Sequence, residues 1–178
     1  MIPQPLRQVL VLLACTGGLA SLLGQANHAL SPLALTITVP GLLIAFAALR
    51  LPVSTGLAVA LLTGLWLDAT APTAFGRHAV LLGLVFCFVH RVRVRLPREE
   101  ILVGVVVALF VNLALFVVLA FISLGQLPDP GAGALRLLAD LLVSQLATAL
   151  IGPWFLALQR HSLIWAGAMP EVATSRFA

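Results

Sequence analysis

Asp68, Arg77 and His78 are the residues whose types and spacing offer the most chemistry in this sequence. They lie in the stretch GLWLDATAPTAFGRHA, between two apolar runs. An aspartate beside a histidine can serve acid–base catalysis, but pairing with an arginine or a histidine is also how a charge is satisfied between membrane helices. The sequence has no G-x-S-x-G, H-E-x-x-H, phosphate-loop or G-x-G-x-x-G pattern. We therefore predict a non-enzymatic protein with no catalytic residue; a membrane-embedded hydrolase using Asp68 and His78 is the alternative.

Cofactor, metal and nucleic-acid sites are not predicted. The two cysteines, Cys15 and Cys87, both lie inside apolar runs, and a zinc site needs about four clustered ligands. The arginine-rich stretch RVRVR, Arg91 to Arg95, is short and has no aromatic residues interleaved for base stacking. The sequence therefore lacks the usual signals of a zinc protein and of a protein that binds single-stranded nucleic acid.

The composition is that of a membrane protein, because 61% of the residues are hydrophobic and only 9% are charged. A spanning helix needs about 20 mainly apolar residues. We predict an all-α membrane protein with six transmembrane helices in a single bundle over residues 1–160, and a partly disordered cytoplasmic tail at 161–178. The predicted helices are 9–24, 33–49, 53–67, 75–89, 101–124 and 137–158. The third and fourth are short, so a re-entrant hairpin at 53–89 is the alternative.

The arginines predict the orientation of the chain. With the N-terminus inside, most of them fall on the inner side, as the positive-inside rule expects, and only Arg77 and Arg136 fall outside. This places both termini in the cytoplasm of a multi-pass inner-membrane protein. The basic loop between the fourth and fifth helices is expected to meet anionic headgroups, or alternatively a cytoplasmic partner, through Arg91, Arg93, Arg95 and Arg98.

Small and polar residues inside the apolar runs predict where helices pack. Gly56, Ala60, Gly64 and Asp68 follow one another at steps of four on one helix face, where small residues let a second backbone approach. This aims Asp68 at a neighbouring helix. Mid-membrane amides need partners, so we expect Asn112 to bond Gln145 or Ser144 across two helices.

The same face leads into the turn that follows Asp68. Pro72 breaks the chain there, and Gly76 allows the turn to close. We expect Arg77 or His78 to return to Asp68 and so to join the two short helices.

The pattern Gly64-x-x-x-Asp68, Pro72, Gly76-x-His78-Ala79, an apolar run and an arginine cluster resembles the MreD family of bacterial rod shape-determining membrane proteins. Motif similarity covers Gly64 to Arg95, and the remainder is similar in hydropathy alone. One departure is Arg77, where the family usually has an apolar residue.

The resemblance implies a non-enzymatic component of the cell-wall elongation (rod) complex, involved in side-wall peptidoglycan synthesis and rod shape. Its expected partners are MreC, by direct docking, and in the larger complex MreB, RodA and the transpeptidase that works with RodA. It also implies that Asp68, Gly76 and His78 stabilise the bundle and shape the surface that partners meet. The implied fold is similar to the membrane substrate-binding subunits of energy-coupling-factor transporters, so a vitamin-binding subunit of such a transporter is the alternative function.

Overall fold

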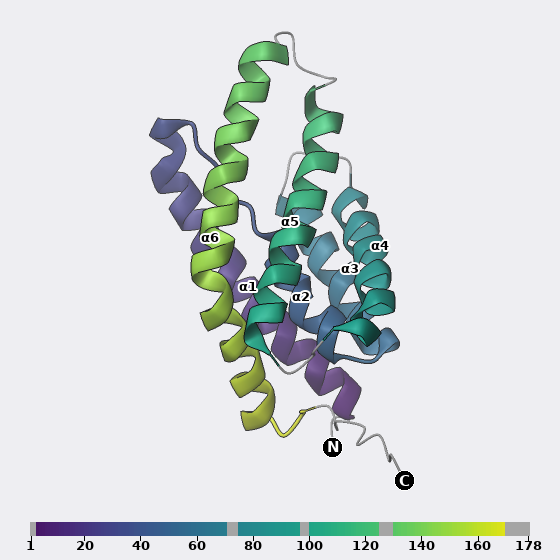
Figure 1. The fold of residues 1–178 in the computed structure, drawn as a ribbon. Helices are drawn as coiled ribbons and strands as arrows, with labels where there is room; N and C mark the ends of the chain where they lie inside the picture. The colour runs from purple at the N-terminus through teal and green to yellow at the C-terminus, as the bar shows by residue number, and fades with distance from the viewer. Residues whose placement is uncertain (1–2, 71–74, 97–99, 125–129, 170–178) are drawn as a thin grey trace.

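The described part of the chain is a bundle of α-helices with two single-turn 3₁₀ helices (Figure 1). The computed structural model describes residues 3–70, 75–96, 100–124 and 130–169. The elements are α1 (Gln4–Leu30), η1 (Ser31–Leu33), α2 (Pro40–Arg50), α3 (Val53–Thr70), α4 (Arg77–Val92), η2 (Arg93–Arg95), α5 (Ile101–Leu124) and α6 (Pro130–Trp165). No strand occurs in these ranges, which agrees with the predicted all-α class.

Within the described residues, four helical stretches are long and apolar enough to cross a membrane, as expected of a multi-pass membrane protein: Gln4–Leu33, Val53–Thr70, Ile101–Ile122 and Gly133–Trp165. The other two helices, α2 with 11 residues and α4 with 16, are shorter than a full span. Six helices are therefore present in the described part of the chain, but six full spans stay a prediction.

The distribution of side chains is that of a protein surrounded by lipid. Large apolar residues point outward, among them Phe110, Phe121, Leu146 and Trp154. Polar residues are buried between the helices instead: Gln8, Thr16, Thr55, Thr63, Asp68, Asn112, Asp140, Ser144, Thr148 and Gln159. Because the surroundings are apolar, the polar contacts inside the bundle help to specify how the helices meet.

The second helix differs most from its predicted boundaries of 33–49. Residues 34–39 are not helical, and α2 begins only at Pro40. α2 lies at the centre of the bundle, and every residue from Gly41 to Leu49 is buried (Figure 1). The stretch that the apolar pattern predicted to be one helix is thus an irregular segment followed by a shorter helix.

Side chains of two flanking helices hold residues 34–39 in place. On one side, Thr36 N–H donates to Asp140 Oδ1 at 2.8 Å and Thr38 N–H donates to Ser144 Oγ at 3.0 Å, both on α6. On the other side, Asn27 of α1 receives the Ile37 N–H at 2.7 Å and donates to the Ile37 carbonyl at 2.9 Å. Irregular backbone inside a bilayer needs such partners, so these side chains explain why the segment need not be a helix.

Replacing Asn27 is expected to loosen this segment. Asn27→Leu removes both hydrogen bonds to Ile37 and leaves a half-buried N–H and carbonyl without partners, at a cost of about 2 kcal/mol. Gln25→Leu is the matched control, because Gln25 is exposed on the same helix. The free energy of unfolding in detergent should fall for Asn27→Leu only; equal losses in the two variants would contradict the assigned role.

The two ends of the described chain meet on the same side of the bundle (Figure 1). α6 continues to Trp165, beyond the predicted end at 158, and residues 166–169 fold back onto α1. There Gln4, Arg7 and Gln8 donate side-chain hydrogen bonds to the carbonyls of Met169, Ala166 and Ala168. The predicted tail at 161–178 therefore begins as ordered structure, and residues 170–178 lie outside the described residues.

Candidate functional site

The carboxylate of Asp68 joins the end of α3 to the beginning of α4. Its Oδ2 accepts the N–H of Gly76 at 3.0 Å and of Ala79 at 3.2 Å. Its Oδ1 accepts the N–H of His78 at 3.0 Å and lies 2.7 Å from His78 Nδ1. Asp68 thus caps the N-terminus of α4 from another helix, where free N–H groups and the helix dipole favour negative charge.

The contact expected between the two short helices is made by His78 and not by Arg77. The side chain of Asp68 is fully enclosed, whereas that of His78 is 15% exposed. Because the carboxylate accepts hydrogen bonds from backbone N–H groups on both oxygens, His78 Nδ1 must be the donor toward it. Among the described residues Arg77 makes no ion pair, and Pro72 lies outside them.

Two glycines shape this junction for different reasons. A Cβ on Gly64 would lie 2.6 Å from the backbone nitrogen of Ala79 and would overlap its Cα, so α3 and α4 touch through their backbones. Gly76 has open space around it but a φ of +93°, which a residue with a Cβ rarely adopts. Gly64 permits close approach, and Gly76 permits the turn that brings its own N–H to Asp68.

The rest of the small-residue face packs as the four-residue spacing predicts. A Cβ on Gly56 would lie 2.5 Å from Cε2 of Phe86 on α4, and Ala60 is fully buried. The face therefore lies against α4 over much of the length of α3.

The hydrogen bond expected from the Asn112 side chain on α5 to Gln145 or Ser144 on α6 is absent from the described structure. The side-chain amides of Asn112 and Gln145 form hydrogen bonds with backbone groups instead. Asn112 Oδ1 accepts the N–H of Gly41 at 3.5 Å, and Gln145 Nε2 donates to the Leu109 carbonyl at 3.2 Å. Ser144 bonds the 34–39 segment. For Asn112 and Ser144 the reason is the late start of α2: its first turn and the preceding non-helical backbone present polar groups that a continuous helix would have satisfied internally, whereas Gln145 bonds a carbonyl of α5.

The predicted basic loop divides into one structural arginine and exposed ones. Arg93 is half-buried, and its Nη1 donates to the carbonyls of Ala48, Leu49 and Leu51 at 3.3, 3.4 and 2.6 Å. It thereby satisfies the free carbonyls at the C-terminus of α2, where positive charge suits the dipole. Arg91 and Arg95 are exposed, and Arg98 lies outside the described residues.

Arg93 is therefore expected to matter for stability more than its neighbour. Arg93→Ala should lower the free energy of unfolding in detergent by about 2 kcal/mol, because it leaves the C-terminal carbonyls of α2 without this donor. Arg95→Ala removes the same charge from an exposed position and should change it by less than about 0.5 kcal/mol. Equal effects of the two variants would show that only charge matters there.

A cavity of about 760 Å³ lies above α2, between α1, the 34–39 segment and helices α3 to α6. Its lining is mostly apolar, with polar groups contributed by Ser21, Asn27, Thr36, Thr38, Thr70, His78 and Asp140. Asp140 is buried, and among the described residues it accepts a single hydrogen bond, from Thr36. The imidazole ring of His78 lines the cavity, and its Nδ1 is hydrogen-bonded to Asp68.

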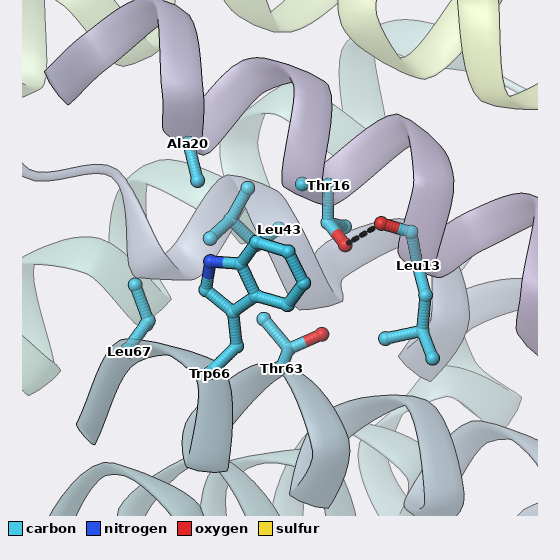
Figure 2. A pocket seen from close by; sticks show the side chains of 8 residues that line it. Leu13, Thr16, Ala20, Leu43, Thr63, Trp66 and Leu67 are labelled. Carbon is cyan, nitrogen blue, oxygen red and sulfur yellow. Dashed lines mark hydrogen bonds between the residues drawn. The ribbon is translucent and has the colours of Figure 1, made fainter. Parts of the chain in front are cut away.

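Trp66 forms part of the wall of this cavity and of a second, smaller pocket. Figure 2 shows its indole beside α1, with Thr16 and Thr63 nearby. The smaller pocket holds about 10 Å³, close to the space of one water molecule. Thr63 Oγ1 is buried there with no hydrogen-bond partner among the described residues, whereas Thr16 donates to the Leu13 carbonyl.

Comparison of the chain with protein-family models, with curated proteins and with solved structures gives no match. The candidate site is therefore defined by its geometry. The sequence pattern identified the Asp68 junction, but it did not identify the cavity. The signal for the cavity was present in the polar residues Asn27, Thr36, Thr38 and Asp140, which come together because residues 34–39 leave the helical conformation.

Proposed function

We propose that this protein is a non-enzymatic inner-membrane component of the bacterial cell-wall elongation complex, which docks MreC and supports side-wall peptidoglycan synthesis and rod shape. One observation carries the proposal: five residues of the pattern that resembles the MreD family, Gly64, Asp68, Gly76, His78 and Ala79, meet at a single junction. Asp68 bonds Gly76, His78 and Ala79, and Gly64 lies against Ala79. These residues of the pattern thus form one contact unit, which supports the proposal.

The departure at Arg77 does not weaken this support. His78, and not Arg77, occupies the position next to the Asp68 carboxylate, at 2.7 Å. A rigid hairpin of α3 and α4 would present a defined surface to a partner helix, which is the role that the proposal assigns to it. MreB, RodA and its transpeptidase partner would then be reached through the larger complex.

The proposed orientation places both termini and the 91–98 loop in the cytoplasm. It is supported by the meeting of the N-terminus of α1 with residues 166–169 on one side of the bundle. Exposed Arg91 and Arg95 would face anionic headgroups there. The six crossings of the proposal are completed by α4 and by the 34–39 segment together with α2.

A vitamin-binding subunit of an energy-coupling-factor transporter is the second candidate function. The cavity of about 760 Å³ favours it, because this volume is typical of small-molecule sites. The first proposal does not require such a cavity.

Depletion of the protein from its native bacterium separates the two functions. The elongation proposal expects rod-shaped cells to widen and become round while vitamin uptake stays normal. Rod shape kept together with a loss of uptake of one vitamin would overturn it in favour of the second candidate.

A further inference from the structure

The polar part of the cavity is rich in hydrogen-bond acceptors. Asp140 is 7% exposed and uses its Oδ1 to accept the Thr36 N–H, so among the described residues its second oxygen has no donor. His78 donates a hydrogen bond from its Nδ1–H to Asp68, which leaves Nε2 as the acceptor of the neutral ring. Ser21 and Thr70 donate their hydroxyl protons to the carbonyls of Gly17 and Leu67, and so also present lone pairs.

Neither arginine nor lysine is among the described residues that line the cavity. Arg136 stands one turn before Asp140 on α6, but it is exposed and forms no ion pair with Asp140. Asp140 thus lines the cavity with no ion pair among the described residues, and a ligand that brings a cation would pair with its carboxylate.

We propose that the cavity binds a molecule with an apolar body and a protonated amine, with the ammonium group on the free oxygen of Asp140 and the body against the apolar wall formed by Leu43, Phe116 and Leu119. An ammonium group has three donors and no acceptor, which matches a lining of acceptors. A carboxylate or phosphate head would meet Asp140 with like charge. This inference goes beyond the proposed function and does not depend on it.

The protein offers its own reporter for the test. Trp66 lines the cavity, whereas Trp154 and Trp165 are 80% and 89% exposed, so Trp154→Phe with Trp165→Phe leaves Trp66 as the single tryptophan. Three probes of matched shape would be titrated against this purified variant: para-bromophenethylamine, para-bromophenethyl alcohol and para-bromophenylacetate. The bromine quenches the indole when the probe occupies the cavity.

The amine is expected to half-saturate the quenching at a concentration about tenfold below that of the alcohol, because a hydrogen bond to a charged group is worth more than a neutral one. The carboxylate should bind more weakly than either. Asp140→Asn, which keeps an oxygen for the Thr36 N–H, should reduce amine binding to the level of the alcohol. Arg136→Gln, an exposed change one turn away, should leave it unaltered.

Equal quenching by the three probes, or amine binding unaffected by Asp140→Asn, would overturn the proposal. If the Asp140 variant is not monodisperse, the proposal is judged from the binding of the amine, alcohol and carboxylate probes to the protein with Asp140 intact. Mass spectrometry of solvent extracts from protein purified out of its native membrane then separates two sources of the ligand. About one amine-headed lipid per protein, displaced by the probe, identifies a lipid; selectivity without such a lipid identifies a free amine. Failure of this test leaves the depletion experiment unaffected, and the reverse also holds.

Discussion

Gly64→Ala is expected to destabilise the protein, although alanine is the better helix former. The added methyl would lie 2.6 Å from the backbone nitrogen of Ala79, where no flexible side chain can move aside. Separation of α3 from α4 would also stretch the hydrogen bonds from α4 to Asp68. Helix propensity alone would favour alanine by about 1 kcal/mol. The steric overlap outweighs this gain, and we expect a net loss of about 2–3 kcal/mol in the free energy of unfolding.

Gly18→Ala is the matched control for this substitution. A Cβ on Gly18 meets nothing within 4 Å, so the same change should be neutral or stabilise by up to about 1 kcal/mol through helix propensity. Unfolding of both variants in mixed detergent micelles measures the difference. Two changes of the same sign would contradict a backbone contact between α3 and α4 at Gly64.

Asp68→Ala is expected to have a second large effect, because one side chain satisfies three backbone donors and a histidine. Its loss leaves the N-terminus of α4 uncapped inside the bundle, and we expect a cost of about 3 kcal/mol. His78→Ala removes only the side-chain contact and keeps the three backbone bonds to Asp68. Its cost should be about 1 kcal/mol.

Comparing the loss of protection in these two variants tests the roles assigned to Asp68 and His78. Hydrogen exchange of the first turn of α4, followed by mass spectrometry, should show loss of protection in Asp68→Ala and near-normal protection in His78→Ala. Equal loss in both would mean that the Asp–His contact, and not the capping of α4, holds the hairpin together.

Local spacing was enough to predict the hairpin between α3 and α4. Residues at steps of four share a helix face, so Gly56, Gly64 and Asp68 had to point in one direction, and a turn of a few residues had to return the chain beside them. The choice of His78 over Arg77 was not predictable, because it depends on the direction in which each side chain leaves the first turn of α4.

Distant contacts decide the part that the sequence did not predict. The apolar run at 33–49 has the composition of a spanning helix, yet residues 34–39 are not helical, because Asn27, Asp140 and Ser144 replace the hydrogen bonds that a helix would supply. Those partners lie on α1 and α6, and no local pattern reveals that they converge. The cavity, which this segment lines, and the hydrogen bond from Gly41 to Asn112 follow from the same late start of α2.

Affinity capture tests the central claim, docking of MreC, most directly. The protein would carry a C-terminal tag, be extracted mildly from its native membrane, and be analysed with its companions by mass spectrometry. We expect MreC and the elongation synthases with the unsubstituted protein and with Gly18→Ala, and a reduced yield of MreC with Asp68→Ala. Recovery of a transporter's ATPase pair and coupling subunit, without MreC, would contradict the proposed function.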